Sequence, residues 1–373
     1  MRKKTKNKHG GFGLQVLLLL FLLLVGANGT YAQSDCFEYE ENVITGLTNI
    51  GMSASSLTIP ATVTTVNSGA FSAAASVSTL IIEAGGNPTF EGKLFGDDKT
   101  NLISEIKILG SSMTVTNIQK LFTSLGAQGA LDEVYIAGYS GEWSDIASNA
   151  VLTSEVTVAL PAALVSTQKF GDATVCGRFE ITKDIISFCG NATFQDTDDG
   201  SNMLFYIADE CNKEEGYIHI QRVSYVKKGE GVLIHNMKNT SAYADLPVYD
   251  GDVTGDDATN YTKNLLKGVT VATPIGKTDG DKTNLVLSNG AFHPTSGGTI
   301  GANKAYLQIP TGAMAAREML TISFNEDATG ILSLQGSGFV LNGSDEYYNL
   351  SGQRVEKPTK GIFIKNGKKY VIK

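Results

Sequence analysis

A short apolar phrase recurs along the first half of the chain. In each copy, a second apolar residue follows the first by three places and a third follows it by five. The copies lie at Ala54/Leu57/Ile59, Val77/Leu80/Ile82, Ile103/Ile106/Ile108, Leu131/Val134/Ile136 and, with a polar first member, Thr153/Val156/Val158. Successive copies are 23, 26, 28 and 22 residues apart. Because the last two apolar positions are separated by one residue, each copy predicts a short strand with one buried face.

Repeats of this length cannot each bury their apolar side alone, so they stack on one another. A period of roughly 20 to 29 residues with one such strand is typical of a leucine-rich repeat solenoid. We therefore predict a short, irregular solenoid over residues 33–170. Its exposed face should carry one column of residues, each lying between the two apolar positions of a strand. The predicted column is Thr58, Ile81, Lys107, Tyr135 and Thr157.

The pattern changes from about residue 175 onward. Short alternating runs separated by turn-rich stretches predict many strands of about four to eight residues. These runs are Arg178–Ile181, Met203–Ile207, Tyr217–Val226, Gly231–His235, Asn284–Leu287, Ala305–Ile309 and Leu320–Phe324. We predict a β-sandwich-like module over residues 171–330, and hence a mainly β protein.

The end of the chain predicts a linker and a separate tail over residues 331–373. Residues 331–345 are rich in Gly and Ser, as flexible connections are. Further on, Asn366-Gly367 between two apolar runs predicts a two-residue β-hairpin, because a type I′ turn needs positive φ at both central positions. Residues 346–373 hold seven basic and two acidic residues, which sets them apart from an acidic chain.

The first 32 residues have the features of a secretory signal peptide. Five basic residues precede the apolar run Val16–Val25, and Thr30-Tyr31-Ala32 supplies a small-x-small cleavage site. The run is shorter than the about 20 residues that a transmembrane helix needs, so we expect cleavage and no remaining transmembrane segment. Gln33-Ser34-Asp35 before Cys36 lacks the small apolar residues of a lipoprotein signal. The mature protein is expected to be secreted or displayed at the cell surface.

Charge and cysteine content narrow the possible partners. The chain has 30 Lys and Arg residues against 38 Asp and Glu; its net charge of −8 becomes −13 when the signal, with five basic and no acidic residues, is removed. Such an acidic chain repels phosphate backbones, so we expect no nucleic-acid partner. In an oxidising compartment, Cys36, Cys176, Cys189 and Cys211 allow two disulfides in three connectivities, a single bridge, or buried thiols.

Two segments imitate binding motifs without completing them. Asp250, Asp252 and Gly255 match the opening of a calcium loop, but the twelfth position, which needs a bidentate carboxylate, is Tyr261. Gly276-Lys277-Thr278 matches the end of a phosphate loop, but Val271 stands where the first glycine is required. We therefore expect no metal and no cofactor.

Recognisable catalytic motifs are also missing from the sequence. His219 and His235 occupy polar positions of predicted strands. The chain has no Gly-x-Ser-x-Gly elbow and no His-Glu-x-x-His motif. We expect a protein that is not an enzyme; paired carboxylates of a carbohydrate-active enzyme remain an alternative, because such partners can lie far apart in sequence.

Two aromatic residues follow the fourth strand phrase, Tyr139 and Trp143. Exposed rings beside a solenoid face could stack on a sugar or anchor a protein partner. The alternative is a loop that folds its own rings back over the coil. The predicted ligand-binding set is Thr58, Lys107, Tyr135, Thr157, Tyr139 and Trp143.

The first coil resembles a known group of repeats. Leu57-Thr58-Ile59-Pro60, followed by Val63, Val66 and Gly69-Ala70-Phe71, resembles the BspA-type leucine-rich repeats of Bacteroidota surface proteins. The resemblance implies that the phenylalanine of each return segment fills the interior of its coil. Phe95 and Phe122 are the corresponding residues of the next two coils.

Two later pieces carry further resemblances. Gly229-Glu230-Gly231-Val232-Leu233-Ile234 and Asp327-Ala328-Thr329-Gly330-Ile331 resemble parts of an uncharacterised module of secreted Bacteroidota proteins. Gly361–Lys373 resembles the end of type IX sorting tails, which implies recognition by export machinery. Together these features predict a surface adhesion protein that binds an extracellular protein or glycan through the solenoid face. A structural envelope scaffold without a specific ligand is the alternative.

Overall fold

The protein is mainly β, as the alternation of its apolar residues predicts. The computed structural model describes residues 33–97, 99–126, 131–196, 203–237, 242–313 and 319–324, together with four short strands between residues 347 and 372. The expected signal over residues 1–32 and the linker over 331–345 lie outside the described residues. No helix among the described residues combines the length and the apolar character needed to cross a membrane.

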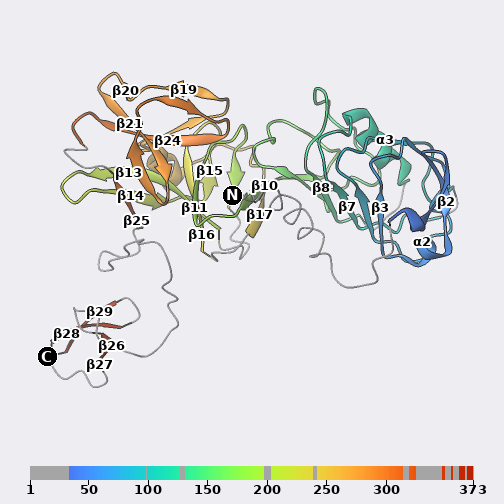
Figure 1. The fold of residues 1–373 in the computed structure, drawn as a ribbon, viewed down its shortest axis with the longest axis horizontal. Helices are drawn as coiled ribbons and strands as arrows, with labels where there is room; N and C mark the ends of the chain where they lie inside the picture. Colours follow the sequence, from blue (N-terminus) through green and yellow to red (C-terminus); the bar gives the residue numbers. More distant parts are fainter. Residues whose placement is uncertain are drawn as a thin grey trace, which may run out of the picture.

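The five repeated phrases form consecutive parallel strands of one seven-stranded sheet (Figure 1). These strands are β3 (Ser56–Ile59), β5 (Thr79–Ile82), β7 (Glu105–Ile108), β8 (Glu133–Ile136) and β9 (Thr157–Pro161). Each strand pairs with the next in chain order, so one repeat stacks on another. The two apolar positions of each strand point inward and are almost fully buried.

The pairing register confirms the first four phrases and corrects the fifth. Leu57 pairs with Leu80, and Ile106 pairs with both Leu80 and Val134, as the repeat predicts. Val134, however, pairs with Val158 and not with Val156. A shift of two residues leaves the same face of a strand inward, so apolar alternation cannot detect it.

The return side of the repeats carries smaller elements. It holds a four-stranded sheet with a helix beside it, together with a 3₁₀ turn before the first strand and a short helix after the second. The elements are η2 (Gln33–Cys36), α2 (Asn49–Ser53), β1 (Phe37–Glu40), β2 (Val43–Leu47), β4 (Thr65–Val66), β6 (Thr89–Phe90) and α3 (Val115–Ser124). Thr114 caps α3 by accepting a hydrogen bond from the backbone N of Asn117 at 3.2 Å.

Aromatic rings fill the space between the two sides. Phe71, Phe95 and Phe122 are buried, as expected for the phenylalanines of the return segments, and Phe170 is buried with them. Glycine permits close stacking where one turn meets the next. A Cβ on Gly110 would lie 3.0 Å from the backbone of Ala84 in the preceding repeat, a tight contact that would push the two turns slightly apart.

The seven-stranded sheet continues past residue 170. Its last two strands are β10 (Thr174–Ile181), parallel to β9, and β17 (Ala242–Pro247), antiparallel to β10. A single core of buried residues runs from Phe37 to Tyr261, so the repeats and the following strands share one apolar interior. The repeats and the later module therefore share a continuous core. The predicted boundary between them at residue 170 rests only on the change in the pattern of apolar residues along the sequence.

The C-terminal half packs two sheets face to face, in keeping with a sandwich-like module. The first sheet contains β11 (Ile185–Phe188), β16 (Val232–Asn236), β13 (Met203–Asn212), β14 (Tyr217–Arg222) and β25 (Thr321–Phe324). The second contains β18 (Leu266–Val269), β24 (Lys304–Pro310), β21 (Lys282–Ser288), β20 (Thr278–Asp279) and β22 (Ala291–Pro294). Leu233, Leu285 and Leu307 belong to the core between them, while Phe205 and Ile234 join the core shared with the repeats.

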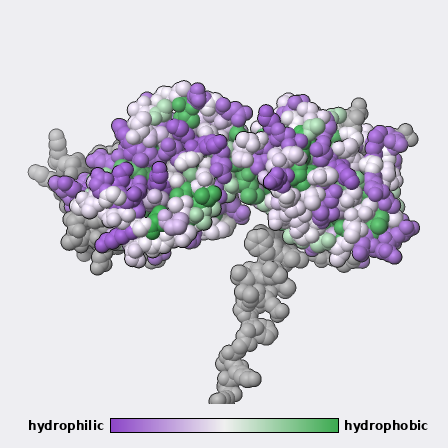
Figure 2. Space-filling model, turned by 90° about the horizontal axis from the view of Figure 1, so that it is seen from above, coloured by the Kyte–Doolittle hydropathy of each residue, from purple (hydrophilic) through white to green (hydrophobic). Residues whose placement is uncertain are grey.

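Smaller elements complete this half. They are β12 (Phe194–Gln195) with β15 (Tyr225–Val226), β19 (Thr273–Ile275) with β23 (Gly298–Ile300), and the helix α4 (Gly255–Tyr261). Figure 2 shows a surface on which apolar residues occur in small, scattered groups between polar ones.

The tail forms a sheet of its own. Its strands are β26 (Tyr347–Tyr348), β27 (Arg354–Val355), β28 (Gly361–Lys365) and β29 (Lys368–Ile372). Among the strands that the structure describes, these four pair only with one another. Lys365 pairs with Lys368. Two residues therefore lie between the paired positions, as the predicted two-residue hairpin requires. Asn366 and Gly367 themselves lie outside the described residues.

Candidate functional site

The outward face of the seven-stranded sheet brings two columns of side chains together. Thr58, Ile81, Lys107 and Tyr135 form the predicted column, and all four are half-buried. The fifth member is Ala159, because Tyr135 pairs with Ala159. Thr157 therefore does not belong to this column, contrary to the sequence prediction. It pairs with Glu133 in a neighbouring column that also contains Thr79, Glu105 and Thr174.

Charged groups on this face are paired with one another. The amino group of Lys107 lies 2.7 Å from a carboxylate oxygen of Glu105. The hydroxyl of Thr79 donates a hydrogen bond to the other oxygen of Glu105 at 3.1 Å. Lys107 is therefore less available to a charged ligand than its position in the column suggests.

Arg178 on β10 is the centre of the most densely connected cluster on the face. Its Nε donates to one carboxylate oxygen of Asp245 at 2.8 Å, and Nη2 donates to the other. The same Nη2 donates to Glu133 at 3.0 Å. The guanidinium also lies between two aromatic rings, 4.3 Å from the centroid of Tyr135 and 4.4 Å from that of Tyr243. Cation–π contacts on both sides hold its plane in place.

The electrostatics of this cluster follow from burial and pairing. Burial lowers the pKa of Arg178, but hydrogen bonds and charges from Asp245 and Glu133 more than offset it, so the pKa is raised. Burial also raises the pKa of Tyr135, against the opposing effect of Arg178. Both side chains keep their ordinary protonation states at neutral pH. The cluster is a fixed ion pair between rings and does not supply an acid or a base.

Tyr243 is the exposed end of this cluster. It is 60% exposed, although one side of its ring rests on Arg178. Tyr243 is not among the predicted site residues, because residues 242–247 were not predicted to be a strand. A signal was present: Ala242–Pro247 alternates small or apolar residues with Tyr243 and Asp245, as a half-buried strand does.

Tyr139 and Trp143 lie away from the two columns. Their ring centroids are 4.9 Å apart, and Trp143 lies 4.8 Å from the buried ring of Phe170. The amide of Gln168 donates to the Tyr139 hydroxyl at 3.0 Å, and the Trp143 indole donates to Asp145 at 3.3 Å. These contacts describe a loop folded back over the core, so the two residues do not extend the ligand face.

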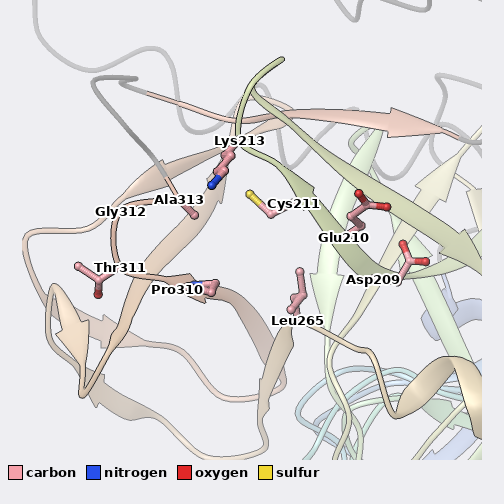
Figure 3. Close-up of a pocket in the computed structure, with 9 residues that line it drawn as sticks. All are labelled: Asp209, Glu210, Cys211, Lys213, Leu265, Pro310, Thr311, Gly312 and Ala313. Carbon is pink, nitrogen blue, oxygen red and sulfur yellow. The ribbon is translucent and has the colours of Figure 1, made fainter.

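A hollow of about 530 Å³ lies in the C-terminal half (Figure 3). Asp209 and Glu210 lie at one end of it, and Lys213 and Cys211 lie nearer the other. A carboxylate oxygen of Asp209 is hydrogen-bonded to Nδ1 of His219. The other ring nitrogen of His219, Nε2, is buried and cannot reach a molecule in the hollow. Burial, followed by the charge of Glu210, raises the pKa of Cys211 and so disfavours its thiolate. These groups do not combine into a nucleophile with its base.

The incomplete motifs have structural roles. Residues 255–261 of the calcium-like segment form α4, and Tyr261 is buried. Its hydroxyl donates to the carbonyl of Tyr225 at 2.6 Å and accepts from the backbone N of Lys227 at 3.1 Å. In the part of the chain that the structure describes, no three His, Cys, Asp or Glu residues are placed to hold a metal ion.

The four cysteines are free thiols. Cys176 and Cys189 are buried, while Cys36 and Cys211 are partly exposed. Burial, followed by the charge of Asp245, raises the pKa of Cys176 to about 12. Burial, followed by the charge of Glu230, raises that of Cys189 to about 11. Of the alternatives that the sequence left open, the structure has the thiols and neither disulfide pattern.

Comparison with known proteins does not assign the chain to a family. No protein-family model matches it, and no curated protein and no solved structure is similar enough to count as a match.

Proposed function

We propose that the protein is a secreted or surface-displayed binding protein that attaches to an extracellular protein or glycan through the outward face of its seven-stranded sheet. The observation that carries the proposal is the uninterrupted pairing of seven strands, which sets two columns of mostly half-buried side chains side by side on one face. Stacked repeats use such extended faces for binding. In this proposal the repeats are an irregular leucine-rich solenoid of the BspA type.

The composition of the face supports binding over catalysis. Threonine is the commonest residue of its two columns, Tyr135 adds an aromatic ring, and the Lys and Arg side chains of the face are already paired. Polar hydroxyls and tyrosine rings are suited to recognition, because they provide contact area and hydrogen bonds without a large desolvation cost. The groups of the hollow in Figure 3 do not converge on a reacting centre.

The proposal extends to export. The apolar run of residues 16–25 would direct the chain across the inner membrane, and the basic tail would be recognised by separate export machinery. The self-contained pairing of β26, β27, β28 and β29 supports a tail that acts as an independent unit.

An attachment screen tests this function. Purified protein is applied to immobilised fibronectin, gelatin and neutral oligosaccharides, and bound protein is quantified. We expect attachment to at least one of these surfaces. The double variant Ile81→Arg/Thr157→Arg, which places two bulky cations on the face, should abolish it.

A matched control carries the same charge on the other side of the repeats. Thr116 and Thr123 are exposed on α3, which packs beside β6, so Thr116→Arg/Thr123→Arg should attach like the wild type. Failure of the wild type to attach to any surface would contradict the proposal and favour a scaffold without a ligand. Equal loss in both double variants would show that charge, and not the face, controls attachment.

A further inference from the structure

We infer that the end of the sheet formed by β8, β9, β10 and β17 is a subsite for a neutral glycan, with Tyr243 as its stacking platform. The inference rests on the proposed binding function and specifies its ligand class and location. The site differs from the predicted column, because its main contact residue lies on β17, beyond the repeats.

Tyr243 combines exposure with a fixed ring. One side of the ring is held by the guanidinium of Arg178, and the residue is nevertheless 60% exposed. A ring already held in place loses little conformational freedom when a ligand packs on it. The apolar C–H face of a pyranose fits the flat ring, and the phenol hydroxyl remains at the edge for a hydrogen bond.

The charges of this region favour a neutral ligand. Arg178 directs its hydrogen bonds to Asp245 and Glu133, so its positive charge is neutralised within the protein. Lys107 is likewise paired with Glu105. An anionic ligand such as a sulfated glycan would meet carboxylates and no free cation on these strands, and like charges in contact are unfavourable.

A hydrogen-bond acceptor lies beside the platform. Glu180 is exposed and is the pairing partner of Tyr243, so it lies beside the ring on the same face. A carboxylate acceptor next to an aromatic ring matches a ligand rich in hydroxyl groups.

The aromatic part of the site is compact. The guanidinium of Arg178 lies 4.3 Å from the ring centroid of Tyr135 and 4.4 Å from that of Tyr243, so the two rings lie close together. A protein ligand would need an apolar anchor site, but Leu102, Leu109 and Met237, which are exposed, do not lie on the strands of the subsite.

The test uses isothermal titration calorimetry with linear hexaoses of glucose, mannose, galactose or N-acetylglucosamine, with heparin as the charged probe and gelatin as the protein probe. We expect binding to at least one neutral hexaose. Because no free charge takes part, its affinity should change less than about threefold between about 50 mM and about 500 mM NaCl. Tyr243→Ala should weaken it at least about tenfold through loss of the stacked ring.

Two control variants show whether the effect of Tyr243→Ala comes from loss of the aromatic ring. Tyr243→Phe keeps the ring and should bind within about threefold of the wild type. Val271→Ala shortens an exposed apolar side chain between β18 and β19, outside the seven-stranded sheet, and should bind like the wild type. Melting temperatures of all variants are measured in parallel, so that loss of fold is separated from loss of the platform.

Other outcomes distinguish the inference from the function on which it rests. Binding to gelatin alone, lost in Ile81→Arg/Thr157→Arg, would overturn the neutral-glycan subsite and leave the proposed binding function in place. Binding to heparin alone would also overturn the neutral-glycan subsite. Hexaose binding that Tyr243→Ala does not weaken would also overturn the subsite. No binding to any probe would contradict both.

Discussion

Arg178 and Tyr135 are in contact across an intervening strand. The guanidinium lies 4.3 Å from the ring centroid, although Arg178 is on β10, Tyr135 is on β8, and β9 runs between them. The residue of β9 that pairs with Tyr135 is Ala159, which is fully buried. A small side chain at this position leaves room for the arginine to extend over the strand. The contact ties the last repeats to the strand that begins the C-terminal half.

Replacing Arg178 tests the importance of this contact for the fold. Arg178→Ala should lower the free energy of unfolding by about 2 to 4 kcal/mol, because it leaves Asp245 and Glu133 without their shared cation in a half-buried place. Urea denaturation followed by circular dichroism measures the change. Arg178→Lys restores the charge without the planar fork, so it should recover only part of the loss. If Arg178→Ala changes the free energy of unfolding by less than about 0.5 kcal/mol, the cluster does not contribute to the stability of the fold.

Neighbouring residues of β7 test which face is buried. Ile108 is 1% exposed, so Ile108→Asp places an unpaired charge in the core and should cost about 3 to 5 kcal/mol or prevent folding. Lys107 lies one place away on the outward face, and Lys107→Ala should change stability by less than about 1 kcal/mol. Thermal unfolding of the two variants provides the comparison. Similar melting temperatures would contradict the register.

Thiol reactivity should follow burial. At pH 8 a raised pKa keeps the proton on sulfur, and alkylation requires the thiolate, so a raised pKa slows the reaction. Cys176, with a pKa of about 12, and Cys189, with a pKa of about 11, should resist iodoacetamide until the protein is denatured. Cys36 and Cys211 are partly exposed and should react first. Mass spectrometry of the native protein checks the order, which labelling of Cys176 as fast as Cys211 would contradict.

The tail should be separable from the rest of the fold. Its described strands pair only among themselves, so deletion of residues 346–373 should shift the melting temperature by less than about 2 °C. Differential scanning calorimetry of the full and shortened chains measures the shift. A fall of more than about 5 °C would mean that the tail completes the core of the larger body.

The sequence predicted the repeated strands because their physics is local. Apolar residues two places apart, such as Leu57 and Ile59, specify which face of a short strand is buried. The register of β9 was not predictable in the same way. Val156, Val158 and Leu160 are all buried, so the alternation fits two registers equally well.

Long-range contacts account for what the sequence did not show. The pairing of β10 with β17 joins residues that are far apart in the chain. The sequence around Arg178 therefore does not predict that Asp245 and Tyr243 are its partners. Tyr139 and Trp143 illustrate the opposite error. Their position after a strand made them candidates for the exposed face. In the structure, however, Trp143 packs against Phe170 and the Tyr139 hydroxyl accepts a hydrogen bond from Gln168, so both rings lie against the core.

The central claim is that the outward face of the seven-stranded sheet is the binding surface, and hydroxyl-radical footprinting tests it most directly. Oxidation of each side chain is measured by mass spectrometry with and without the probe that attaches most strongly. The account predicts that Tyr135, Tyr243 and Ile81 are protected by the bound probe, while Tyr39 on β1 and Val271 between β18 and β19 are oxidised as before. Protection of Tyr39 or Val271 with unchanged oxidation of the sheet face would contradict it.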